Sequence, residues 1–171
     1  SKLVTCHNFY PQQYTGLSLA HFNKCNEKMK SMHLPVAAFI SSNSEGTYGP
    51  WPVNEGLCTL EMHRGLPMDF QARHLFATGM VDDVLVANAY ASDEELKACA
   101  AVNPSILTFG LVLEKELTET EQKILDYGPK HVVRGDMSEY MIRSTWPRVT
   151  FADAPVPAAN TRDLKRGDVV I

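Results

Sequence analysis

Residues 3–18 read LVTCHNFYPQQYTGLS, and this stretch decides how the first part of the chain is expected to fold. Its apolar start, Leu3–Cys6, is typical of a short buried strand, and Ser18 is a favourable N-cap for a helix that reaches Met32. Because the carboxyl ends of parallel strands carry the ligand in α/β folds, we expect a site in the loop between them. The side chains there that can form hydrogen bonds are His7, Asn8, Tyr10 and Tyr14.

The strand–loop–helix pattern occurs twice more in the first hundred residues. The apolar run at 35–40 predicts a buried strand, and a long loop, 41–64, follows it. A capping box, Ser92-x-x-Glu95, predicts the start of a helix that ends near Val102. Three consecutive βα units favour a parallel sheet or barrel. The remaining expected elements are a helix from Pro67 to Ala77, ended by Gly79, and a strand from Asp83 to Ala87.

The pattern changes after Asn103, where we place the boundary between a first domain, 1–103, and a second domain, 104–171. The second domain shows no βα alternation, and several prolines interrupt its last part. We expect one short helix in it, 118–125, and several strands. The expected strands are 106–113, 132–133, 141–142 and 168–171.

Composition argues against several classes of partner. The chain has 171 residues and a formal charge of −4, so we do not expect a nucleic-acid surface, which needs a basic stripe. No apolar run is long enough to span a membrane. The four cysteines lie far apart in sequence and favour reduced thiols in a cytoplasmic protein. Histidine and cysteine spacings match no metal site, so we expect no metal and no cofactor.

Several motifs, in the same order along the chain, resemble the 6-phospho-N-acetylmuramidase family, also known as the outer surface protein family. Together they cover nearly the whole chain, and their number makes the resemblance specific. The motifs are HNFYP at 7–11, YTGLS at 14–18, AAFI at 37–40, EGLCTLEMHR at 55–64, DDV at 82–84, NAYAS at 88–92, VRGD at 133–136 and IRS at 142–144.

This resemblance implies an α/β fold: a (β/α)8 TIM barrel followed by a cyclophilin-like β domain. The chain would then hold the last three βα units of the barrel, lack the first five strands, and stop inside the second domain. The implied activity is cleavage of the phosphorylated amino-sugar disaccharide N-acetylmuramic acid 6-phosphate–N-acetylglucosamine in peptidoglycan recycling. Catalytic residues in missing strands would leave the fragment inactive alone. An unclosed sheet exposes its edges, which predicts self-association.

Glycoside hydrolysis generally needs two carboxyl groups at the scissile bond. We expect Glu61 to be one of them, because the neighbouring His63 and Arg64 would keep it ionised as a base, a nucleophile or a sugar ligand. The competing interpretation of Glu61 is a surface ion pair with Arg64. Glu55, beside a glycine, is expected to accept hydrogen bonds from the substrate or to form a turn. The proton donor is expected outside this chain.

The other candidates are expected to bind the sugar and its phosphate. His7 could shuttle a proton or contact a hydroxyl group, Asn8 suits an acetamido or hydroxyl group, and Tyr10 and Tyr14 could stack on a pyranose ring. Arg64 is the first phosphate candidate, since phosphate in barrels often sits at the loops after strands seven and eight. A buried structural group is the alternative for His7, and surface ion pairs are the alternative for the arginines. The further expected substrate-binding residues are His63, Asn88, Tyr90 and, in the second domain, Arg143.

Three other functions stay open at this point. The first is a phosphosugar-binding or regulatory protein that keeps the pocket without turnover. The second is prolyl isomerisation by the cyclophilin-like part, which rests on fold alone. The third is a structural fragment that pairs its sheet edge with another copy.

Overall fold

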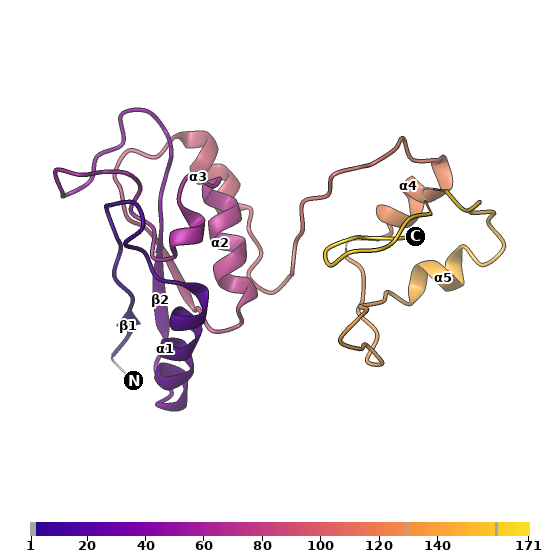
Figure 1. Cartoon of the computed structure of the whole chain (residues 1–171), viewed down its shortest axis with the longest axis horizontal. Coiled ribbons are helices and arrows are strands. Elements are labelled where there is room, and N and C mark those ends of the chain that lie inside the picture. Colours follow the sequence, from indigo (N-terminus) through magenta and orange to yellow (C-terminus); the bar gives the residue numbers. More distant parts are fainter. Residues whose placement is uncertain (1–2, 129, 160) are drawn as a thin grey trace. The chain divides into compact units, whose positions relative to one another are not determined.

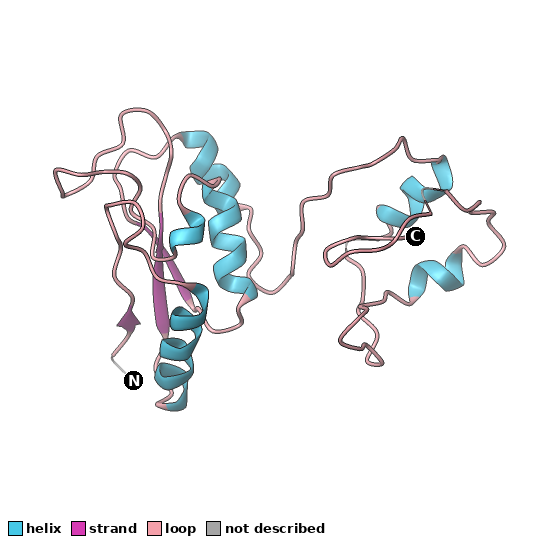
Figure 2. Ribbon diagram, viewed as in Figure 1, coloured by secondary structure: helices cyan, strands magenta, loops and turns pink. Residues whose placement is uncertain are grey.

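The computed structural model describes residues 3–128, 130–159 and 161–171. The chain forms two compact units, residues 1–109 and 110–171. The first unit contains a small parallel sheet with helices packed against it, and the described residues of the second form two short helices (Figures 1 and 2). The chain is therefore of mixed α/β type, as the sequence predicted.

Three parallel strands form the sheet, in the order β1-β2-β3. The strands are β1, Thr5–Cys6; β2, Val36–Ile40; and β3, Asp83–Val86. Thr5 pairs with Val36, and Ala37 pairs with Asp83. Leu3, expected in the first strand, lies before it and is exposed. Because the strands are parallel, the loops that follow them leave the sheet on one side.

Capping side chains set the helix starts that the sequence predicts. The hydroxyl group of Ser18 accepts a hydrogen bond from the His21 N–H at the start of the first helix. Ser92 and Glu95 form the predicted capping box. Gly79 follows the second helix with φ of +69°, a conformation that favours glycine. The helices of this unit are α1, Leu19–Ser31; α2, Met68–Ala77; and α3, Asp93–Ala100.

The core of the first unit lies between β2 and the helices α1 and α2. Phe22 from α1 and Leu75 from α2 are fully buried in one cluster with Ile40 of β2. Burying a side chain of this size contributes roughly 1.5–3 kcal/mol to stability. This core holds β2 in place, and the loop that follows β2 begins immediately after Ile40.

The second unit contains less regular structure than the sequence predicts. Its helices are α4, Glu119–Leu125, and α5, Trp146–Thr150. The first was expected; the second was not, because we interpreted Pro147 as a break although proline also starts helices.

The predicted strands at 106–113, 132–133, 141–142 and 168–171 are wrong, since none of them forms in the described part of the chain. A single bridge joins Val133 and Ser144. Sequences with a high strand propensity become strands only where a partner strand supplies ladder hydrogen bonds and apolar contacts, and here side chains such as Val112 are exposed.

Three kinds of feature are not found among residues 3–128, 130–159 and 161–171. No helix there is long and apolar enough to cross a membrane. No group of three or more histidine, cysteine, aspartate or glutamate side chains is placed to hold a metal ion. The four cysteines, all of them described, are free thiols and form no disulfide.

Candidate functional site

The loops that follow the three strands lie side by side. The loop after β1 pairs with the loop after β2 through a parallel bridge between Leu17 and Leu60. An antiparallel bridge between Tyr48 and Ala89 joins the loop after β2 to the loop after β3. Polar residues far apart in sequence therefore meet at the carboxyl ends of the strands, where the site was expected.

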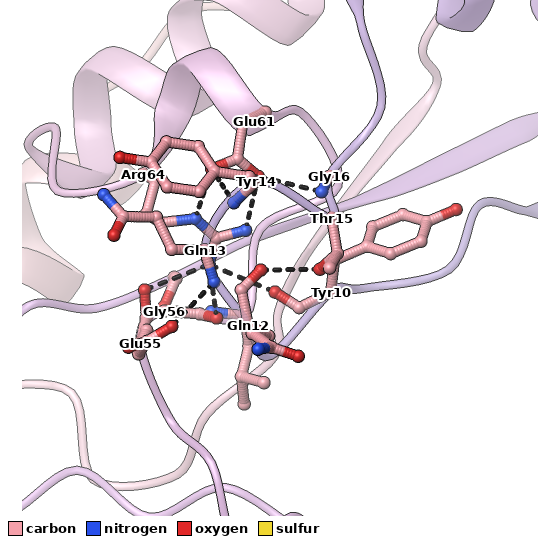
Figure 3. A network of polar contacts seen from close by, with 12 residues as sticks. Tyr10, Gln12, Gln13, Tyr14, Thr15, Gly16, Glu55, Gly56, Glu61 and Arg64 are labelled. Atoms are coloured by element: carbon pink, nitrogen blue, oxygen red, sulfur yellow. Dashed lines mark hydrogen bonds and ion pairs between the residues drawn. The ribbon is translucent and has the colours of Figure 1, made fainter.

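A bidentate ion pair between Glu61 and Arg64 lies where these loops meet (Figure 3). A short 3-10 helix, η1, Glu61–His63, interrupts the predicted long loop and places the two side chains together. The Arg64 Nε and Nη2 groups donate to Glu61 Oε1 and Oε2 at 2.8 and 2.7 Å. The same carboxylate accepts hydrogen bonds from the backbone N–H groups of Tyr14 and Gly16, both at 2.8 Å.

All four hydrogen bonds favour the ionised form of Glu61. The pair with Arg64 is the largest cause; together with the two backbone donors it outweighs burial and lowers the pKa of Glu61 to about 2. Hydrogen bonding to the carboxylate raises the pKa of Arg64 in turn. A carboxylate whose two oxygens each accept two hydrogen bonds is a weak base and a hindered nucleophile. Glu61 thus forms the ion pair with Arg64 that was its alternative interpretation. Its catalytic role stays a prediction.

The loop after β1 approaches Glu61 so closely that residue 16 must be glycine. A Cβ atom on Gly16 would lie 2.7 Å from both the backbone nitrogen and the Oε2 atom of Glu61. Tyr14 adopts φ of +70°, a strained conformation for tyrosine, and its N–H bond to Glu61 holds it there. The glycine of the YTGLS motif is therefore required by this contact.

Arg64 also joins two loops to each other. Its Nη1 group donates to the backbone carbonyls of Tyr10, Glu55 and Gly56 at 3.1, 3.0 and 3.0 Å (Figure 3). The side chain of Arg64 is only 9% exposed. One Nη2 hydrogen has no partner among the described residues, so most of the donors of Arg64 serve the protein itself. Its role as a phosphate ligand stays a prediction.

An open hollow of about 500 Å3 lies beside this ion pair. Glu55 lines it, and its Oε2 atom accepts a hydrogen bond from the Gln13 N–H at 2.7 Å. Its Oε1 atom has no hydrogen-bond partner among the described residues. The other polar side chains around the hollow are those of Gln13, Ser42, Asn43, Thr47, Asn54 and Arg64. Amide, hydroxyl and carboxylate groups around one space suit a ligand with many hydroxyl groups.

Two buried amide side chains fix the start of the loop after β2. Gln71 accepts from the Ser41 N–H at 3.0 Å and donates to the Ser41 carbonyl at 2.9 Å. Asn88 bonds the N–H and carbonyl of Ser42 in the same way, at 2.9 Å each. Asn88 was predicted to bind substrate, and its amide is instead occupied by the backbone that lines the hollow. Its substrate contact stays a prediction.

Glu95 fixes the next residues of the same loop. Its carboxylate accepts hydrogen bonds from the hydroxyl groups of Ser42 and Ser44 at 2.5 and 2.6 Å and from the Asn43 N–H at 3.0 Å. Burial raises the pKa of Glu95, but these donors together lower it to about 2. Glu95, the second residue of the α3 capping box, therefore also holds one wall of the hollow in place.

Two predicted histidines are buried and bonded to other side chains. The Nε2 atom of His7 lies 2.6 Å from Asn26 Oδ1, and its ring centroid is 4.5 Å from that of Phe22. His63 is completely buried, and its Nε2 atom lies 2.7 Å from His74 Nδ1. Burial, and then the charge of His74, lowers the pKa of His63 to about 4. The contacts of His7 match its alternative interpretation as a buried structural group, and the roles of both histidines at the substrate stay predictions.

The remaining predicted residues lie at the surface. Tyr14 and Tyr90 are largely exposed, with φ of +70° and +67°. Asn8 and Tyr10 line a second hollow, of about 250 Å3. Arg143 belongs to the second unit, where it forms an ion pair with Asp136 at 3.0 Å. Its role as a phosphate ligand stays a prediction.

Sequence comparison places the chain in a known family. A family profile described as 6-phospho-N-acetylmuramidase, N-terminal, matches residues 1–101. A second profile, described as 6-phospho-N-acetylmuramidase, C-terminal, matches residues 107–171. The chain belongs to the 6-phospho-N-acetylmuramidase family. The resemblance inferred from the motifs is thereby confirmed. No curated protein matches this family member.

Two solved structures are similar to it. An uncharacterized protein of B. cereus is 45% identical, with a TM-score of 0.82, over 92% of this chain and 45% of that protein. A conserved Enterococcus faecalis protein of unknown function is 34% identical, with a TM-score of 0.51, over 56% of this chain and 26% of that protein. This member of the 6-phospho-N-acetylmuramidase family thus spans less than half the length of either relative.

Three residues that shape the site were not among the candidates from sequence. Gln71 lies on the buried stripe of α2, and a polar residue at such a position signals a buried hydrogen-bonding role. Glu95 was assigned to its capping box alone. Trp51 lines the second hollow. The local sequence does not indicate this position, because a tryptophan in a long loop can equally be buried.

Proposed function

We propose that this 6-phospho-N-acetylmuramidase family member forms part of the site that hydrolyses N-acetylmuramic acid 6-phosphate–N-acetylglucosamine in cytoplasmic peptidoglycan recycling. The observation that carries the proposal is the polar hollow at the carboxyl ends of the strands, where Glu55 presents a free carboxylate oxygen beside Arg64. We place residues 1–103 at the end of a TIM barrel and 104–171 in a cyclophilin-like domain. Self-association through the sheet edge remains part of the proposal.

The reaction consumes one water molecule. Its hydroxyl group bonds to the anomeric carbon, the glycosidic C–O bond breaks, and the leaving oxygen takes a proton. Two carboxyl groups support these transfers in most glycosidases. We propose that Glu55 contacts the sugar, because one of its oxygens is open to the hollow. Glu61 instead holds Arg64 and the loop after β1 in place. The catalytic role that the sequence suggested for Glu61 stays the alternative to this division.

A product assay on the synthetic disaccharide tests the proposal. The chain is compared with a version extended by five further βα units, each with Glu55→Gln or Glu61→Gln. We expect turnover by the extended protein, loss of kcat in the Glu55→Gln variant, and a smaller loss of activity and stability together in the Glu61→Gln variant. No product from the extended protein would contradict hydrolysis. If only the Glu61→Gln variant lost kcat while it remained folded, Glu61 would be the catalytic residue instead.

A phosphosugar-binding protein without turnover is the second candidate. One observation favours it: the Glu61 carboxylate, the residue first expected to act in catalysis, is fully engaged in hydrogen bonds to the protein. Such a protein would bind the disaccharide through the same hollow and release no product. Calorimetric titration of the extended protein with the disaccharide, beside the product assay, separates binding alone from hydrolysis.

A further inference from the structure

Trp51 is an exposed tryptophan set in a hollow of its own. Its surface is 56% exposed, and none of the ring contacts among the described residues involves it. The hollow, of about 250 Å3, is also lined by Asn8, Phe9, Tyr10 and Pro11. Large aromatic side chains exposed in a concave surface are typical of binding sites, because their burial by a ligand is favourable.

The part of the wall formed by Phe9 and Tyr10 is held in place by contacts with neighbouring residues. The Phe9 ring packs edge-on against Phe39, with centroids 5.3 Å apart. The Tyr10 N–H donates to the Cys58 carbonyl at 3.2 Å, while its own carbonyl accepts from Arg64 at 3.1 Å. A ligand entering this hollow would therefore meet a wall that is already formed, which lowers the entropic cost of binding.

The two hollows are neighbours. Gln13 and Glu55 line the first, Pro11 and Trp51 line the second, and the Glu55 N–H donates to the Pro11 carbonyl at 2.9 Å. The same two chain segments thus border both spaces, and this hydrogen bond ties one segment to the other. A ligand made of two linked rings could place one ring in each hollow.

We infer that the second hollow is the subsite for the uncharged N-acetylated ring of a disaccharide, which stacks on Trp51. This inference rests on the proposed function, and it places the phosphorylated ring in the first hollow beside Arg64. Among the described residues, no charged side chain lines the second hollow, in contrast to the first. Its volume is below the roughly 300–1,000 Å3 of drug-sized ligand sites, which suits a single pyranose ring.

Asn8 supplies the polar contact. Its Oδ1 atom accepts from the Phe9 N–H at 3.0 Å, and its Nδ2 group has no partner among the described residues. The free amide N–H can donate to the acetamido carbonyl of the sugar, while the indole face covers its C–H surface. An aromatic face with one oriented amide is a common way of binding a neutral sugar ring.

The two tryptophans of the chain provide the test and its control. Trp146 lies in the second unit and is 54% exposed, which matches the 56% of Trp51. In a Trp146→Phe background, N-acetylglucosamine should shift the emission of Trp51. Titration of the chain should show that Trp51→Ala lowers the affinity for the phosphorylated disaccharide about tenfold. Trp146→Ala should leave this affinity unchanged, and Trp51→Ala should leave that of N-acetylmuramic acid 6-phosphate unchanged.

The outcomes separate this inference from the proposed function. Equal affinities of wild type and Trp51→Ala for the disaccharide would overturn the inference, even with turnover intact in the extended protein. An equal loss for the monosaccharide phosphate would overturn it too, since Trp51 would then serve the first hollow. The extended protein could also bind the disaccharide in a manner that depends on Trp51 but release no product. This result would support the subsite and contradict the proposed hydrolysis.

Discussion

Replacing Glu61 with glutamine should destabilise the first unit strongly. The carboxylate accepts four hydrogen bonds, two from Arg64 and two from backbone N–H groups. Glutamine keeps one acceptor oxygen and turns an NH2 group toward the remaining donors, so two hydrogen bonds are lost and Arg64 loses its counter-charge. Removing one partner of a buried ion pair costs about 3–5 kcal/mol. Because Glu61 is one quarter exposed, we expect about 2–3 kcal/mol.

Urea denaturation followed by far-UV circular dichroism measures this loss of unfolding free energy. Asp69→Asn is the matched control in the same unit, because it breaks the Asp69–Arg73 pair on α2, which has one hydrogen bond between the side chains. That control should cost less than about 1 kcal/mol. Similar losses in both variants would refute the argument that the four-bonded carboxylate holds the loops together.

The dependence on pH gives the same prediction a sign. The folded pKa of Glu61 is about 2, below its value of about 4.3 in an unfolded chain. Its contribution is therefore complete above the unfolded pKa and disappears as pH falls toward 2. The stability difference between wild type and Glu61→Gln should shrink between about pH 4.5 and pH 2. A difference that is constant over this range would contradict the ionised, paired carboxylate.

Three further substitutions test other parts of the site. Gly16→Ala should lower the denaturation midpoint far more than Gly135→Ala, because an added Cβ is crowded only at the first position. Arg64→Met should weaken binding of the phosphorylated disaccharide, measured by calorimetry, far more than its unphosphorylated form; equal losses would remove Arg64 from the phosphate site. Glu95→Gln should lower affinity for the same sugar by releasing the wall of the first hollow. Glu121→Gln, in the capping box of α4, should not lower this affinity. Equal effects of the two substitutions would mean that Glu95 acts only as a helix cap.

Much of the first unit could be predicted because its signals are local. Ser18 and the pair Ser92 and Glu95 cap helices through residues three positions away, and the apolar run at 35–40 is long enough to fill a buried strand. In the described part of the second unit, the helix predicted at 118–125 forms, but the predicted strands do not. Its β-prone segments, such as 106–113, have the right composition, but strand formation depends on a partner that local sequence does not specify.

The meeting of the polar loops was predicted from sequence, but the contacts within them were not. The polar loops after the strands do meet, as βα topology requires. The two backbone donors to Glu61, however, come from Tyr14 and Gly16, more than 40 residues earlier, and no local pattern shows that approach. The burial of His63 against His74 depends likewise on how η1 packs on α2. Residue type indicated which polar groups these loops carry, and tertiary contacts decide which of those groups are free.

We propose above all that the hollow at the carboxyl ends of the strands binds a phosphorylated amino sugar. The most direct measurement is nuclear magnetic resonance of the 15N-labelled chain titrated with N-acetylmuramic acid 6-phosphate. We expect the backbone amide signals of Gln13, Asn43, Asn54 and Gly56 to shift with one shared affinity. Shifts confined to residues outside this hollow, or no shifts at millimolar sugar, would contradict it.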